Sequence, residues 1–413
     1  MNHKIGNIFK GDKVIWMVFF FLCMISIVEV FSASSNLTYR SHNYIGPILY
    51  HSSTIIFGVV VAIITLNIPC RYFKIMTLPL LAISLFTLLW VLVGGETING
   101  ANRVISLFGL TFQPSEIAKG SVVLASAQIL SATQHEDGAD KKAFKWIMWI
   151  TLVAAILIGK ENLSTAALLV LVVILMMFIG RVPKALLLKL IGILVLGAVF
   201  AVSAVMLVGN SNVDEQEAEG APTEKGWVAK QLHRADTWKG RILSFFEELP
   251  PPEDYNVDKN QQVAHANIAI ASSGIIGKGP GQSVERDFLP QAFSDFIYSI
   301  IIEELGILGA TAVVFLYIIL LYRTARIASR CENNFPAFLA MGLALLLVVQ
   351  ATFNMMVAVG FAPVTGQPLP LVSKGDTSTI INCAYIGVIL SVSRSAKMKG
   401  EKAVRKKAVS GGA

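Results

Sequence analysis

The sequence has little charge and little cysteine for its length. Only 15% of its 413 residues are Asp, Glu, Lys or Arg, and 54% are hydrophobic. Soluble proteins carry about 25% charged residues, so this composition excludes an ordinary soluble domain. The four cysteines, Cys23, Cys70, Cys331 and Cys383, lie in apolar runs or on the side that we expect to be cytoplasmic. We therefore expect a polytopic membrane protein without disulfides.

Motifs that bind nucleotides or nucleic acid are also missing. The string GKGPG at residues 277–281 lacks the strand–loop–helix context and the Lys-Ser/Thr of a phosphate-binding loop. The formal net charge of +7 could indicate nucleic-acid binding. The basic residues, however, gather beside apolar runs and in a C-terminal tail, where they orient membrane proteins and contact anionic lipid. We expect no nucleic-acid partner.

What the sequence has instead is a series of long apolar runs. A helix of about 20 apolar residues crosses a bilayer, and the chain contains about ten such spans. They lie near residues 14–32, 49–68, 75–94, 113–132, 144–159, 163–180, 185–208, 298–322, 336–360 and 378–394. The first run is too long for the core of a signal peptide, so we expect it to stay in the mature protein. The sequence predicts one all-α integral membrane domain over residues 1–413.

The distribution of Lys and Arg predicts the orientation of the spans. If both termini are cytoplasmic, most of the 34 Lys and Arg residues fall on the cytoplasmic side, as membrane proteins favour. Residues 1–13 and the basic tail 395–413 are then cytoplasmic, and residues 209–297 form a long extracytoplasmic loop between spans 7 and 8. Within this loop, residues 227–246 suit an interfacial amphipathic helix, and residues 263–276 suit an apolar stretch that re-enters the membrane.

Three acids mark the start of the eighth span. Asp295 follows a polar loop rich in Gly and Pro, and Glu303 and Glu304 lie inside the apolar run. An acid at the middle of a membrane helix costs about 2.5–3.5 kcal/mol, so such residues are functional candidates. On an ideal helix Glu303 falls about 80° from Asp295, and Glu304 about 180° away. From the residues alone, Asp295 is either a general base in a partly dry cavity or, with Ser294, a helix N-cap.

Further charged residues lie on the expected external side. Pro114 suits the first position of a helix, Glu116 falls in its first turn, and Lys119 follows three residues later. These two charges form either a local ion pair or part of a binding site. Arg103 has no acidic neighbour in the sequence and could bind an anion. Residues 160–162, Lys-Glu-Asn, break an apolar run, and we interpret them as an interfacial turn.

The segment from Gly360 to Thr379 contains three prolines and three glycines at the end of a span. It cannot be ordinary helix, so we expect a rigid loop that lines a cavity. Its Lys374 and Asp376 either pair with each other or serve a site. The external side as a whole is rich in cations that would attract a phosphorylated, lipid-anchored molecule. These are Arg40, Arg103, Lys160, Arg234, Arg241, Lys278, Arg286 and Lys374.

Four blocks, in order and over essentially the whole chain, resemble the SEDS family of cell-wall polymerases (shape, elongation, division and sporulation). They are NGA, Arg103 and FQPSEIAK within residues 99–119; residues 160–166; residues 241–306 with Gln262, GKGPG and SDFIY; and PVTGQPLPLVSKGDTS at residues 363–378. The third block is more similar to the division members of the family than to the elongation members.

The resemblance implies a SEDS fold and a peptidoglycan glycosyltransferase that polymerises lipid II, an undecaprenyl-pyrophosphate-linked disaccharide pentapeptide, at the division septum. It implies that Asp295, the Asp of the DFI element, is catalytic. Candidate substrate-binding residues are Arg103, Glu116, Lys119, Gln262, Lys278, Arg286, Ser373 and Lys374. Implied partners are a class B penicillin-binding protein and other membrane proteins of the division machinery. No cofactor is expected beyond a divalent cation, Mg or Mn, that could share the pyrophosphate charge.

The sequence departs from the family pattern at several positions. Val104 replaces a Trp, Lys374 replaces a Tyr, and Asp376 replaces a Gly. Residues 160–164 replace all but the Leu of the family's QPDLG, which weakens any transfer of roles to that element. The element around Asp295 is intact.

Two other functions stay open, a lipid II flippase and a non-catalytic division scaffold. A flippase needs polar residues that continue from the external side toward the cytoplasm. The inner halves of most spans are Leu, Ile, Val and Ala, which favours the enzyme.

Overall fold

The computed structural model describes residues 10–34, 46–94, 96–98, 101–107, 110–208, 239–240, 261–289 and 292–410. This part of the chain has a long helix at each of the ten expected apolar runs. They are α2 (Lys13–Ala33), α4 (Gly46–Asn67), α5 (Cys70–Gly94), α6 (Pro114–Ala132), α7 (Lys141–Glu161), α8 (Leu163–Ile179), α9 (Lys184–Val208), α13 (Ile297–Ala328), α14 (Asn334–Ala358) and α15 (Asp376–Ser410). By length and composition, eight of them can cross a membrane; the other two are α6 and the shorter α8. The predicted all-α membrane fold is confirmed.

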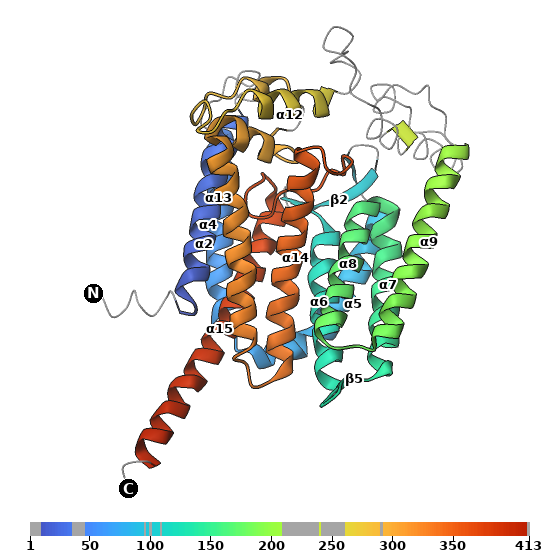
Figure 1. Cartoon of the computed structure of the whole chain (residues 1–413), viewed down its shortest axis with the longest axis vertical. Coiled ribbons are helices and arrows are strands. Elements are labelled where there is room, and N and C mark those ends of the chain that lie inside the picture. The colour runs from blue at the N-terminus through green and yellow to red at the C-terminus, as the bar shows by residue number, and fades with distance from the viewer. Residues whose placement is uncertain are drawn as a thin grey trace.

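The long helices stand side by side, and a further helix, α12 (Gln261–Ala271), lies across one end of the bundle (Figure 1). Helix α2 begins, and α15 leaves the bundle, at the opposite end. There the Asp12 carboxylate accepts hydrogen bonds from the first N–H groups of α2 and pairs with Arg323 of α13 at 2.9 Å. The stretch that we expected to re-enter the membrane forms α12 and the turn at 272–276. The expected amphipathic helix at 227–246 falls almost wholly outside the described residues.

Two short antiparallel sheets join helices, and the sequence did not predict them. The first links α5 to α6 and contains β1 (Glu96–Ile98), β2 (Ala101–Leu107) and β3 (Leu110–Phe112) in the order β1-β2-β3. The second links α6 to α7 and contains β4 (Gln134–His135) and β5 (Gly138–Ala139). Within each connection the short strands satisfy their backbone N–H and C=O groups by pairing with one another. Apolar content does not indicate such pairing, so a search for apolar spans cannot detect these strands.

The turn between α7 and α8 explains how two apolar runs meet with so short a break. Asn162 ends α7 and caps α8, because its side-chain oxygen accepts from Ser164 N at 3.0 Å and from Thr165 N at 3.2 Å. The predicted break is present, but it is Asn162 alone, because α7 continues through Lys160 and Glu161. The final helix differs from expectation: α15 continues to Ser410, well beyond the apolar run that ends near 394.

The core lies where α14 and α15 pack against their neighbours, and α9 at the edge of the bundle is almost entirely exposed (Figure 1). Small residues let α4 and α15 approach closely, as is usual between membrane helices. A Cβ at Gly387 would lie 2.5 Å from Ala62 O, and a Cβ at Gly58 would lie 2.7 Å from the Cys383 sulfur. This packing fixes the helix ends that carry the polar loops.

Candidate active site at the start of helix α13

Asp295 lies in a turn before α13, not in the helix. Helix α13 begins at Ile297, and its N-cap is Phe296, without a side-chain cap hydrogen bond. The N-cap interpretation of Ser294 and Asp295 is therefore wrong. The helical angles expected between Asp295 and the two glutamates do not apply either, because residues 292–296 are a turn.

The main chain of Asp295 is held by the neighbouring helix α14. The buried side chain of Asn354, on α14, donates to Asp295 O and to Gln367 O, both at 2.7 Å. The Asp295 side chain is half-buried, and its Oδ1 accepts from Ser294 Oγ at 2.9 Å. Gly366 has a φ of 65°, and a Cβ there would lie 3.3 Å from Asp295 Oδ2. A glycine at this position lets the loop pass close to the carboxylate.

The loop between α14 and α15 pairs with the turn that carries Asp295. Ser373 Oγ donates to Ser294 O at 2.6 Å and accepts from Leu369 N at 2.7 Å. Lys374 N donates to Phe293 O at 2.9 Å, and the Lys374 ammonium lies 4.9 Å from the centre of the Phe293 ring. Lys374 thus forms a cation–π contact. Of the two alternatives that the sequence left open, the ion pair with Asp376 is not among the ion pairs of the described residues.

Four helices anchor the rest of this loop by hydrogen bonds. Gln350 of α14 donates to Pro368 O at 3.1 Å, and Gln367 donates to Thr165 Oγ1 of α8 at 2.7 Å. Tyr317 of α13 donates to Pro370 O, and Ser26 of α2 donates to Val372 O at 2.7 Å. The predicted non-helical conformation of the loop is confirmed. That it is rigid and lines a cavity stays a prediction.

Glu116 and Lys119 form the local pair that their spacing allows. Lys119 Nζ lies 2.8 Å from Glu116 Oε1 and donates to Gln350 Oε1 at 2.8 Å. Both side chains are buried, and Lys119 is 1% exposed. A role for either residue in binding substrate stays a prediction, and it requires the substrate to reach this buried pair.

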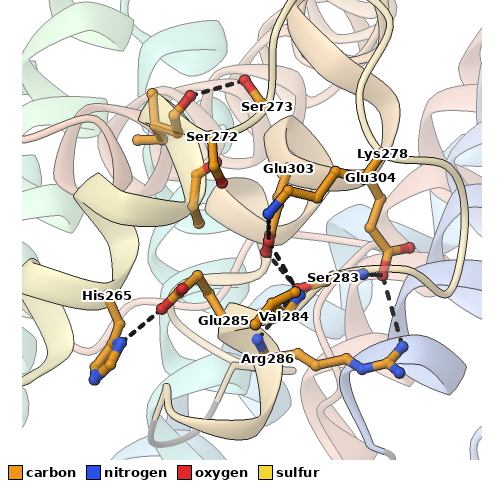
Figure 2. Close-up of polar contacts among 12 residues, drawn as sticks. His265, Ser272, Ser273, Lys278, Ser283, Val284, Glu285, Arg286, Glu303 and Glu304 are labelled. Atoms are coloured by element: carbon orange, nitrogen blue, oxygen red, sulfur yellow. Dashed lines mark hydrogen bonds and ion pairs between the residues drawn. The ribbon is translucent and has the colours of Figure 1, made fainter.

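Glu303 and Glu304 bind the loop that follows α12 (Figure 2). Glu303 accepts from Lys278 Nζ at 2.6 Å, from Val284 N at 3.0 Å and from the Ser283 hydroxyl. This carboxylate is fully buried, so its charge needs such a set of donors.

Glu304 is equally buried and equally supplied with donors. It accepts from Gly281 N at 2.8 Å, from Ser283 N at 3.2 Å and from the Ser32 hydroxyl of α2. Arg286 Nη1 donates to Ser32 Oγ at 2.7 Å and lies 3.9 Å from Glu304 Oε1 (Figure 2). Lys278 and Arg286 therefore already serve these two acids, and their predicted contact with substrate stays a prediction.

Backbone pairing reinforces the same junction. Helix α13 is interrupted at Gly306, which has a φ of 70° and a ψ of −172°. Lys278 N and Gly279 N donate to the carbonyls of Glu303 and Glu304, both at 2.9 Å. A Cβ at Gly306 would lie 2.5 Å from Gly277 N, so two chain segments meet here without room for a side chain.

Some polar residues of this region were missed by the sequence analysis. His265 Nδ1 lies 2.6 Å from Glu285 Oε2, and the His265 ring stacks on Phe288 with 5.5 Å between centroids. Their separation of 20 residues left no local signal. Gln350 and Asn354 could have been found, because two amides one helical turn apart inside an apolar run are a recognisable pattern.

The remaining predicted site residues are placed only in part. Gln262 lies in the first turn of α12 and is half-buried. Arg103 belongs to β2, and its side chain lies outside the described part of the structure. Among the described residues, no three His, Cys, Asp or Glu side chains gather into a metal-binding group.

The helix bundle and the turn that carries Asp295 at one of its ends define a polytopic membrane protein with a polar site at that end. The model of the FtsW/RodA/SpoVE family, described as cell cycle protein, matches residues 12–398. The chain belongs to this family.

Curated relatives are similar over nearly their whole length. The "Probable peptidoglycan glycosyltransferase FtsW" of Geobacter metallireducens is 30% identical over 408 residues, which are 97% of this chain and 99% of the relative. The protein with the same name from Coxiella burnetii is 27% identical, over 91% of this chain and 95% of the relative.

Solved structures share the fold. A chain of "Structural coordination of polymerization and crosslinking by a peptidoglycan synthase complex" is 26% identical, with a TM-score of 0.69 over 94% of this chain and 98% of that chain. RodA of Thermus thermophilus, a rod shape determining protein, is 22% identical, with a TM-score of 0.64 over 94% of this chain and 99% of its own.

Proposed function

We propose that this chain is a peptidoglycan glycosyltransferase that polymerises lipid II during cell division, with Asp295 as the general base. The observation that carries the proposal is the half-buried turn before α13, where hydrogen bonds to its main chain hold Asp295 beside Gly366. The names of the relatives support the reaction class. The intact DFI element supports the choice of residue.

The reaction needs a base because a sugar hydroxyl is a poor nucleophile at neutral pH. In the proposed step the 4-hydroxyl oxygen of the acceptor sugar bonds to the anomeric carbon of the donor. Asp295 takes the hydroxyl proton, and the bond from the anomeric carbon to undecaprenyl pyrophosphate breaks with its electron pair on the pyrophosphate. A positioned carboxylate typically contributes about 10²–10⁴-fold to such a step.

The leaving pyrophosphate needs positive charge. Lys374 is one candidate cation, because its backbone bonds to the turn that carries Asp295. Arg103 on β2 is the second candidate. Charge-assisted bonds to developing negative charge are worth most where water is scarce. A divalent cation could share this role if the substrate completes its ligands.

The proposed partner is a class B penicillin-binding protein that crosslinks the new strand, together with other membrane proteins of the division machinery. One structure with this fold belongs to a synthase complex that couples polymerization and crosslinking, which supports such a partner.

We propose a multi-pass arrangement in the bacterial inner membrane with both termini in the cytoplasm and the Asp295 end outside. Helix α2 begins and α15 leaves the bundle at the end opposite α12 (Figure 1), and most basic residues lie on that side. Residues 1–13 and 395–413 are then cytoplasmic, and residues 209–297 are extracytoplasmic. A reporter fused after Lys407 should signal from the cytoplasm, and an external signal would reverse this topology.

The decisive experiment compares Asp295→Asn with Asp287→Asn in the purified full chain, with its partner, on lipid II. Asp287 lies in the preceding loop with a 45% exposed side chain. We expect Asp295→Asn to lose glycan synthesis by at least about 10²-fold while its melting temperature stays close to wild type. Asp287→Asn should polymerise normally. Retained polymerisation by Asp295→Asn would remove Asp295 as the base.

A further inference from the structure

Helix α14 carries two buried amides that face the same loop. Gln350 and Asn354 are one helical turn apart, and each is 1% exposed. They donate to consecutive carbonyls of the loop, since Asn354 bonds to Gln367 O and Gln350 bonds to Pro368 O. Amides buried in a span of otherwise apolar residues cost free energy unless they are fully used. Their hydrogen bonds to the loop therefore indicate a role in addition to packing.

Asn354 uses both of its N–H groups, and one of them holds Asp295. A primary amide has two N–H donors, and here they bridge Asp295 O and Gln367 O at 2.7 Å each. The Asn354 Oδ1 atom is buried without a hydrogen-bond partner in the described part of the chain. The Asn354 side chain therefore acts in this site as a hydrogen-bond donor to two backbone segments, the turn at Asp295 and the loop at Gln367.

The position of Asp295 is set from α14 more than by the start of its own helix. The first backbone carbonyl that α13 uses belongs to Phe296, which accepts from Ser299 N at 2.9 Å. Asp295 O lies outside this ladder, and its donor is 59 residues away in the sequence. Asn354 thus holds the turn through the main chain of Asp295, in addition to the bonds that Ser373 and Lys374 make to Ser294 O and Phe293 O.

The two hydrogen bonds from Asn354 to Asp295 O and Gln367 O form a clamp, and a second set of contacts connects this clamp to α6. Gln350 donates to Pro368 O at 3.1 Å and accepts from Lys119 Nζ at 2.8 Å, and Lys119 pairs with Glu116. The chain of contacts from α6 through α14 reaches the loop that faces Asp295. It contacts the loop one residue beyond the carbonyl that Asn354 holds, so its influence on Asp295 is less direct.

We infer that Asn354 is a positioning residue for Asp295: its two N–H groups lock the catalytic turn to the loop at Gly366–Pro368, and Gln350 supports that loop. The inference rests on the proposed function. A carboxylate displaced by about 1 Å from a productive geometry can lose about 10²-fold in rate. Loss of the clamp should therefore lower kcat while the binding of lipid II is kept.

The test compares four variants of the full chain in complex with its partner. Asn354→Leu removes both donors, Asn354→Gln keeps two donors but moves them by one methylene, and Gln350→Leu removes only the supporting contact. The control is Thr324→Val, which removes a buried polar group elsewhere in the bundle. The Thr324 hydroxyl donates to Leu320 O at 2.8 Å within α13. Melting temperature, KM and kcat for lipid II polymerisation are measured for each.

We expect kcat to fall by about 10–100-fold in both Asn354 variants, with KM changed less than about threefold. Gln350→Leu should lose less, and Thr324→Val should keep the wild-type kcat. Asn354→Gln decides the matter if Asn354→Leu does not fold. Its amide still donates to both carbonyls, so the fold is kept, but the added methylene displaces the turn that carries Asp295. Wild-type kcat in a folded Asn354→Gln, or losses that follow melting temperature alone, would overturn the inference.

Parallel assays of wild type and Asp295→Asn separate this inference from the proposed function. If wild type does not polymerise lipid II, or if Asp295→Asn matches it, the proposed function fails. If Asp295→Asn is inactive and the Asn354 variants keep wild-type kcat, only the positioning role fails.

Discussion

The acids at the start of α13 have two different kinds of surroundings. Glu303 and Glu304 are fully buried, and each has a cation, a hydroxyl and at least one backbone N–H group beside its carboxylate. Asp295 is half-buried, accepts from the hydroxyl of Ser294 and is fixed through its main chain. The difference teaches that an acid within a membrane span is not by itself a sign of chemistry. A full set of donors suits a charge that holds structure together.

The strongest test of this contrast removes a scaffold acid. Glu304→Leu takes away the acceptor of two backbone N–H groups and of Ser32, and it leaves Arg286 beside an apolar side chain. Breaking a buried charged contact costs about 3–5 kcal/mol, so we expect a large fall in melting temperature and in yield of folded protein. Glu136→Leu, at an exposed acid of the turn between β4 and β5, is the control. Normal stability of Glu304→Leu would erase the distinction between the two kinds of acid.

A smaller loss of stability is expected at the glycine that breaks α13. Gly306→Ala must hold a positive φ, which costs an L residue roughly 1–2 kcal/mol, and its methyl meets Gly277 N at 2.5 Å. Thermal unfolding in detergent should show the loss. Gly192→Ala on α9 meets nothing within 4 Å and should be neutral or slightly stabilising. Equal melting temperatures for the two variants would mean that the junction tolerates side chains.

The smallest expected effect separates binding from scaffolding. Arg103→Ala should raise KM for lipid II about tenfold at unchanged melting temperature, since one charged hydrogen bond to the pyrophosphate is lost. Lys278→Met should do the reverse, with a lower melting temperature and an unchanged KM, because Lys278 neutralises Glu303. Steady-state kinetics and thermal unfolding of both variants decide this. A raised KM in Lys278→Met would move that lysine into the binding site.

The spans could be predicted from the sequence because their signal is local. Length and apolar content alone place a helix at each of the ten runs. The polar residues at 160–162 include Asn162, a residue type that commonly caps helices, and it caps α8. The short strands were missed because they depend on pairing between loop segments. The extension of α15 to Ser410 was missed because apolar content says nothing about a polar helix that continues beyond the bundle.

The site could be predicted only in outline. The resemblance selected Asp295, and spacing found the pair of Glu116 and Lys119. Spacing also gave the wrong cap at Asp295, because a good capping residue does not form a cap when the helix starts two residues later. Asn354 reaches Asp295 across 59 residues, and Gln367 reaches Thr165 across 202. Such contacts arise from tertiary packing, which one sequence does not encode locally.

The interruption of α13 at Gly306 bears on how the protein enters the bilayer. Backbone groups on both sides of the break find their partners in residues 274–279, which precede the helix in the order of synthesis. Released alone into hydrocarbon, the helix would carry unpaired peptide groups at several kcal/mol each. We therefore expect this crossing to be stable in the bilayer only when it is paired with the segment ahead of it. The eighth crossing and the loop that leads to Asp295 are in this way expected to fold as one unit.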